Sequence, residues 1–200
     1  MAIITANNQS MTAITSLPSG VSAKSMILLA TETASSSSTV TFASNIDDTY
    51  KEYIIKFYDV HPATDNQPLT VGFRDGSTAY DATKTTTFFY AYQGESSGTS
   101  ALAYVTGSDL AQATGFQKLT GSVGNGNDES CTGTLHLYDP SNTTFVKHFI
   151  SHVQYAYPTD ETQNAYVAGY INTTTAIDEV SFKFTSGAIA AGTFKLYGVV

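Results

Sequence analysis

Apolar and polar residues alternate along most of the chain in short runs, the pattern of strands that bury one face. The clearest run is 52–60, where β-branched and aromatic residues fill most positions. Turn residues separate the runs about every 8–15 residues, so we expect about eight to ten strands. The other runs are 26–30, 39–43, 69–74, the second half of 85–92, 132–138, 144–155, 164–171, 180–185 and 193–200.

This spacing predicts an all-β fold, an antiparallel β-sandwich of the jelly-roll type. A doubly wound fold needs helices between its strands, and only 109–113 has the pattern of a single helical turn. The least regular region is 94–130, with an exposed loop at 121–129. We expect one sandwich domain over 25–200, preceded by an extended arm over 1–24 in which apolar residues are scattered.

Several strands carry apolar or aromatic side chains at consecutive positions, and therefore on both faces. Examples are Ile54 beside Ile55 and Phe88 beside Phe89. One face of such a strand fills the core. We expect a further layer or a second subunit to cover the other face.

Composition excludes several functional classes. The chain has 200 residues, of which 13% are charged, with a net charge of −8 and a single cysteine. One cysteine builds neither a disulfide framework nor a cysteine-rich zinc site. Nine Lys and Arg residues, spread singly, give no footprint for nucleic acid. No apolar run approaches the roughly 20 residues of a membrane-spanning helix, and the first residues lack the pattern of a secretory signal peptide. We therefore expect synthesis in a cytoplasm and release by lysis or within an assembly.

Three histidines are the first candidates for chemistry. His148 and His152 are four residues apart in one predicted strand and therefore share a face, and His136 lies in the preceding strand. Three imidazoles can bind a metal ion. Because no carboxylate or thiol is fixed beside them, hydrogen bonding at the sheet surface is the favoured interpretation.

Acidic residues occur in three turn-like segments. The segment 125–129 (NGNDE) resembles a crude cation loop but lacks the ligand spacing of a calcium site. Asp47–Asp48 and Asp160–Glu161 are adjacent carboxylates, whereas a glycosidase needs two that face each other across a sugar. We expect a solvated loop and two turns.

Neither a nucleophile elbow, a P-loop nor a dinucleotide fingerprint occurs in the sequence. Cys131 has no partner histidine of a known type, so we expect a buried thiol. The sequence therefore assigns no catalytic, cofactor-binding or metal-binding residue. The segments 142–144 and 172–174 match the N-glycosylation pattern, but without a signal peptide we expect them to stay unmodified.

Tyrosine on a strand is usually a core-edge or interface residue, but a surface tyrosine can also stack on a sugar. The tyrosines that are candidates for sugar stacking are Tyr90, Tyr92, Tyr104, Tyr155, Tyr157, Tyr166 and Tyr170.

Four segments resemble virion proteins of marine tailed bacteriophages, cyanophage-like ones among them. They are 49–65 (TYKEYIIKFYDVHPATD), 149–152 (FISH), 169–174 (GYINTT) and the closing 191–199 (AGTFKLYGV), which is similar to a G-T-[FI]-x-L-Y-G terminus in that group. The resemblance extends over most of the chain from about residue 15. It implies a jelly-roll structural protein of the virion and supplies no catalytic residue.

Two functions follow from this resemblance. The first is a non-enzymatic capsid decoration or cement protein, a homotrimer that binds the major capsid protein and stabilises the assembled shell. The second is a tail or fibre appendage that adheres to a host-surface glycan, with the irregular region 94–130 as a place for binding. We expect neither nucleic acid nor membrane as a partner, and an enzyme ranks third.

Overall fold

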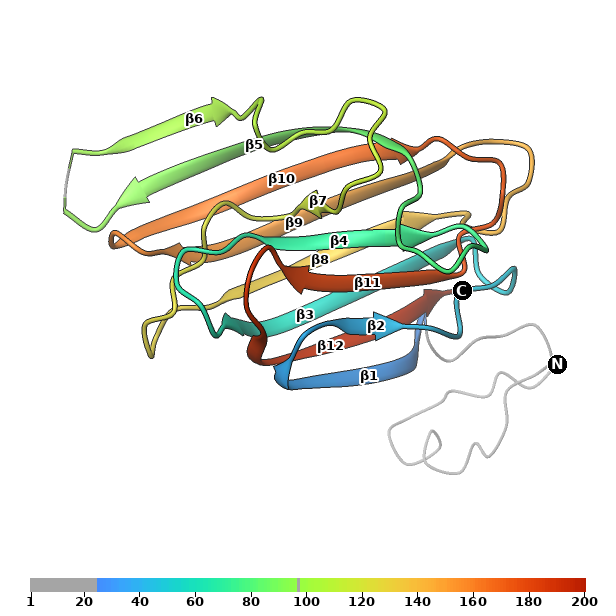
Figure 1. Cartoon of the computed structure of the whole chain (residues 1–200), viewed down its shortest axis with the longest axis horizontal. Helices are drawn as coiled ribbons and strands as arrows, with labels where there is room; N and C mark the ends of the chain where they lie inside the picture. The colour runs from blue at the N-terminus through green and yellow to red at the C-terminus, as the bar shows by residue number, and fades with distance from the viewer. Residues whose placement is uncertain (1–24, 97) are drawn as a thin grey trace, which may run out of the picture.

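The computed structural model describes residues 25–96 and 98–200, which form two antiparallel β-sheets packed face to face (Figure 1). The predicted arm over 1–24 lies outside the described residues. An eight-stranded sheet has the order β1-β12-β3-β8-β9-β10-β5-β6, and a four-stranded sheet has the order β2-β11-β4-β7. Within the described part of the chain the structure is therefore all-β and sandwiched, as the alternating pattern predicts.

The strands of the large sheet are β1 (Met26–Ser37), β3 (Glu52–Pro62), β5 (Lys84–Gly94), β6 (Ser100–Tyr104), β8 (Cys131–Tyr138), β9 (Lys147–Tyr157), β10 (Glu161–Ile171) and β12 (Ile189–Val199). Those of the small sheet are β2 (Val40–Phe42), β4 (Leu69–Arg74), β7 (Gln117–Lys118) and β11 (Glu179–Phe184).

The strand pairing is that of a jelly roll. The first four strands of the chain pair with later strands in reverse order: β1 with β12, β2 with β11, β3 with β8 and β4 with β7. Each connection from β1 to β4 crosses from one sheet to the other. The eight strands thus form one long antiparallel hairpin rolled into a sandwich, which is the jelly-roll architecture predicted from the sequence.

Two hairpins are inserted into this roll and widen one sheet. The pair β5 and β6 follows β4, and the pair β9 and β10 follows β8. Both pairs join the large sheet beyond β8, where β10 pairs with β5. Figure 1 shows β5 and β6 extending past the edge of the small sheet.

The core lies between the sheets because alternate side chains of the large sheet point toward the small one. Along β9 the positions alternate strictly between buried and exposed from Lys147 to Tyr155. At the centre, Phe182 of β11 packs between Phe57 of β3 and Phe194 of β12, with ring centroids 6.0 and 5.2 Å away. All three rings are fully buried, so this cluster joins the two sheets.

Most predicted strands are confirmed within one to three residues at each end, but the structure corrects four details. Twelve strands, rather than eight to ten, lie in the described residues. β1 continues to Ser37, past the end of the predicted run 26–30, because it pairs with β12 along its whole length. The short strands β6 and β7 fall in the region expected to be irregular, and the segment 109–113 is not helical. Among the described residues no helix is long and apolar enough to cross a membrane.

Candidate functional site

The face of the large sheet turned away from the small one, here called the outer face, is open to solvent. Alternation along the strands places the exposed or half-buried residues of β3, β8, β9, β10 and β5 on this face. The face carries exposed large apolar side chains, among them Ile150 at 48%, Tyr166 at 40% and Phe89 at 39% exposure. Such a surface is typical of an interaction site.

Three rings form a ladder across the outer face, here called the aromatic ridge. His152 of β9 is in register with Tyr166 of β10, which is in register with Phe89 of β5. The His152 and Tyr166 rings stack with centroids 4.4 Å apart and planes 12° apart, and Tyr166 and Phe89 stack at 5.2 Å and 10°. These spacings match the separation of neighbouring strands, about 4.8 Å. The rings therefore cover one another's faces and present their edges to solvent.

A trough runs beside the ridge across the same three strands. Its outer-face lining is His148 and Ile150 of β9, Ala168 and Tyr170 of β10, and Thr85 and Thr87 of β5, and its volume is about 510 Å³. Ala168 lies between two tyrosines, at positions 166 and 170 of the same strand face. A methyl group between two phenol rings leaves a depression, so this small residue forms the floor of the trough.

Two lysines lie in the other half of the outer face, on β3 and β12. The ammonium of Lys56 lies 5.8 Å from the ring centroid of Tyr197, and that of Lys195 lies 5.9 Å from the ring of Tyr58. Both ammonium groups therefore lie within reach of the negative face of an aromatic ring. The ridge and trough themselves carry no Lys, Arg, Asp or Glu.

The three histidines share the outer face but do not converge on one point. The Nδ1 of His136 lies 2.6 Å from a carboxylate oxygen of Glu52, and the Nε2 of His152 lies 2.7 Å from the side-chain oxygen of Asn164. No group of three potential metal ligands occurs within residues 25–96 and 98–200. Hydrogen bonding at the sheet surface, the favoured interpretation of the sequence, describes His136 and His152.

The acidic segments take up turn and loop roles. Asp47 accepts hydrogen bonds from the Thr49 amide and the Tyr53 hydroxyl, both at 2.9 Å, and the bonds from Thr49 contribute most to holding its pKa below the usual value. Asp160 adopts a positive φ of 57° in the turn between β9 and β10. Asp47, Asp48 and Asp160 therefore lie between strands as expected, whereas Glu161 is the first residue of β10.

The loop at 125–129 closes on its own glutamate. The carboxylate of Glu129 accepts a hydrogen bond from the Gly126 amide. A Cβ added at Gly124 would overlap this carboxylate, and one at Gly126 would come within 2.8 Å of it. The absence of a side chain at Gly124 and Gly126 therefore leaves room for the Glu129 carboxylate to fold back onto the loop.

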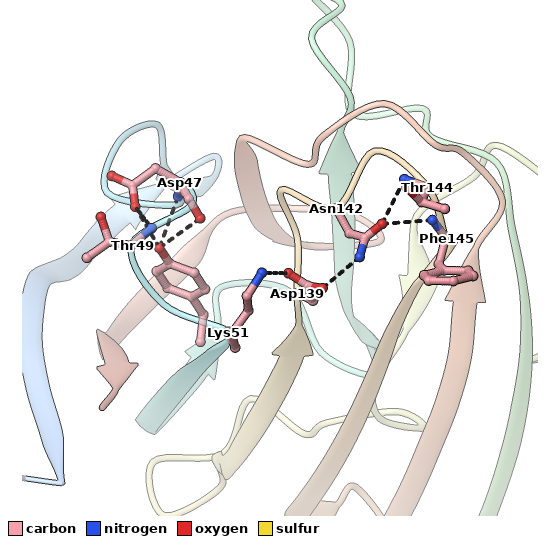
Figure 2. A network of polar contacts seen from close by, with 8 residues as sticks. Asp47, Thr49, Lys51, Asp139, Asn142, Thr144 and Phe145 are labelled. Carbon is pink, nitrogen blue, oxygen red and sulfur yellow. Dashed lines mark hydrogen bonds and ion pairs between the residues drawn. The ribbon is translucent and has the colours of Figure 1, made fainter.

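A second polar network joins two loops at one end of the sandwich (Figure 2). Lys51, just before β3, forms a 2.8 Å ion pair with Asp139, which also accepts a 2.8 Å hydrogen bond from the amide of Asn142. The oxygen of Asn142 accepts from the backbone amides of Thr144 and Phe145. This turn holds the ring of Phe145 at 69% exposure. Because the Lys51 ion pair is itself exposed, it contributes at most about 1 kcal/mol to stability.

The structure removes two tyrosines from the candidates for sugar stacking. Tyr155 is buried, where its hydroxyl donates to Gln163 at 2.6 Å and accepts from the Gly121 amide at 2.8 Å. Tyr166 is exposed, but both faces of its ring are covered within the ridge. Burial of Tyr155 follows from its inward position on β9, whereas the covered faces of Tyr166 depend on strand register.

The remaining candidates fall into two places. Tyr90 and Tyr157 line a pocket of about 210 Å³ together with Lys118 and Gln163, on the inner side of the large sheet. Tyr104 and Tyr170 lie on the outer-face side, where the hydroxyl of Tyr104 donates to Asp109 at 2.5 Å. Tyr92 packs against Tyr90 with ring centroids 5.8 Å apart.

Cys131 is buried as the sequence predicts, and burial raises the pKa of its thiol. Sequence reasoning missed Ala168, the floor of the trough. The signal that indicates it is the pattern bulky–small–bulky at positions 166, 168 and 170 of one strand face. Comparisons of the chain with known protein families, with curated proteins and with solved structures find no match.

Proposed function

We propose that this chain is a non-enzymatic structural protein of a bacteriophage virion, a capsid decoration protein that binds and stabilises the assembled shell. The observation that carries the proposal is the open outer face, whose aromatic ridge and trough carry no charged residue. Protein interfaces have this composition, since their centres are depleted in charged residues and enriched in aromatic ones.

The size of the outer face also suits contact with protein. Eight strands about 4.8 Å apart span roughly 38 Å, and strands that average about 10 residues run roughly 34 Å, which gives a face of roughly 1,300 Å². A protein–protein interface of standard size buries about 800 Å² on each partner. The jelly roll supports the same proposal, because viral capsid domains use this architecture, and so does the resemblance of the four sequence segments to phage virion proteins.

The experiment is to locate the protein in virus-sized particles purified from the source of its gene. Antibodies against the recombinant chain and quantified peptide mass spectrometry give its copy number in separated heads and tails. We expect many copies per head, at a fixed ratio to the major capsid protein. Detection in tails alone, or absence from particles, would refute the decoration role.

The alternative is an appendage protein that binds a host-surface glycan, and the pocket at Tyr90 and Tyr157 favours it. Two phenol rings beside the polar groups of Lys118 and Gln163 offer both stacking and hydrogen bonding to a sugar. A glycan array tests this candidate with the wild-type chain and the Tyr90→Ala variant. Binding by the wild type that the variant lacks would favour adhesion, whereas no binding by either would exclude it.

A further inference from the structure

We propose that two copies of this chain pair through their outer faces, with the aromatic ridge of each copy seated in the trough of the other. The inference concerns the protein before it joins a virion, because the pair covers the same outer face that the proposed function assigns to contact with the shell. It rests on the shape of the outer face, where a ridge and a trough of equal length lie side by side across β9, β10 and β5.

The strand register makes this surface complementary to itself. The residues of the ridge are in one row, and Ile150, Ala168 and Thr87 form the next row, two residues from the ridge residue of the same strand. The two rows are therefore parallel and about 7 Å apart. Consider a two-fold axis in the plane of the interface that runs parallel to the two rows, midway between them. Rotation about this axis places the ridge row of one copy opposite the second row of the other copy, and the reverse.

This operation pairs large side chains with small ones. The ring of Tyr166 meets Ala168 of the partner subunit, at the floor of the trough. Phe89 meets Thr87 of the partner subunit, and His152 meets Ile150 of the partner subunit. The two sheets then pack face to face, as in a sandwich, at about 10 Å.

Area and charge agree with a second copy as the occupant. A face of roughly 1,300 Å² exceeds the area of about 800 Å² that each partner buries in a standard interface. The same two-fold axis places Lys56 and Lys195 opposite Ile54 and Tyr197 of the partner subunit, since these pairs occupy the two rows of β3 and β12. Like charges therefore do not meet.

Sedimentation equilibrium on the purified full chain tests the pairing. We expect the wild type to have the mass of two chains, and the variants Tyr166→Glu and Ala168→Lys each to have the mass of one. Each substitution occurs twice in a two-fold interface. Loss of one hot-spot side chain raises the Kd of an interface about 30-fold, so two such losses should raise the Kd of the pair about 1,000-fold.

The decisive step is to mix the two variants. In a mixed pair one Glu at position 166 faces one Lys at position 168, while the other Tyr–Ala contact stays native, so the mixture should regain the mass of two chains. The control Leu102→Lys changes an exposed outer-face leucine on β6, beyond both rows, and should leave the wild-type pair intact. Phe89→Glu with Thr87→Lys forms a second such charge pair, in case either of the first variants fails to fold by circular dichroism.

Three results would overturn the inference. They are a single-chain mass for the wild type at every concentration, a failure of both charge pairs to reassociate on mixing, and a mass of three chains. The last result would support the homotrimer that the sequence predicts.

Discussion

Raising the pH from 7 to 9 should stabilise the wild-type protein relative to a Lys84→Met variant. Lys84 begins β5 and is fully buried, and its ammonium donates to the carbonyls of Ala82 and Gly115, both at 2.8 Å. The backbone amide of Lys84 also donates to the carbonyl of Ala113, and the amide of Ala113 donates to the carbonyl of Lys84. Lys84 therefore attaches the segment before β7 to the large sheet, and it does so with a buried charge.

The magnitude follows from the pKa. Burial lowers the pKa of Lys84 from 10.5 to about 8. Between pH 8 and 10.5 the unfolded chain binds the proton more tightly than the folded one, so the free energy of unfolding rises with pH. The cost of the buried charge is fully present below pH 8 and is relieved as the pH approaches 10.5. A shift of 2.5 pKa units corresponds to about 3.4 kcal/mol in full, of which about 1.3 kcal/mol is gained between pH 7 and 9.

The assay is urea unfolding of both proteins at pH 7, 8 and 9. Other groups titrate in this range, and burial raises the pKa values of Cys131 and Tyr155, which lowers stability as the pH rises. The difference between wild type and Lys84→Met removes these shared contributions. Lys118→Met, which removes a half-buried lysine that also donates to a carbonyl, controls for the loss of a lysine as such. A difference that is the same at all three pH values would refute the reasoning.

Three other predictions concern stability. The thiol of Cys131 should react with a maleimide only through opening of the fold, so its labelling rate should rise with urea; fast labelling of the native protein would contradict its burial. Tyr155→Phe should cost about 1–3 kcal/mol in thermal or urea unfolding, because the side-chain oxygen of buried Gln163 loses its donor and the half-buried Gly121 amide loses its acceptor; a neutral change would show that water replaces the hydroxyl. Gly124→Ala should destabilise the wild type but have little effect in a Glu129→Ala background, because the added Cβ meets that carboxylate; equal effects in both would exclude the clash.

The sequence predicts most of the large strands because their residues alternate or are apolar throughout. β9 is the clearest example, with buried and exposed positions in strict succession. The pattern fails where tertiary pairing decides the conformation. β7 has only two residues, and the end of β1 is a run of serines, yet both pair with partners more than 40 residues away.

The candidate site could be predicted only in part. Consecutive apolar residues such as Phe88 and Phe89 indicate that a strand presents an apolar side chain on its second face. The ridge itself needs Phe89 to lie beside Tyr166, and that contact depends on the pairing of β5 with β10, two strands far apart in the sequence. Local periodicity carries no information on which strands become neighbours, so it could indicate the small residue Ala168 on its strand but neither the ridge nor the full trough.

The central claim is that the open outer face of the large sheet is the surface by which this protein contacts other protein. Under the proposed decoration role, a cryo-electron microscopy reconstruction of the virion tests this claim most directly. The account predicts density for protein packed against the ridge at His152, Tyr166 and Phe89. A reconstruction in which these rings face solvent, while other surfaces of the sandwich make every contact, would contradict it.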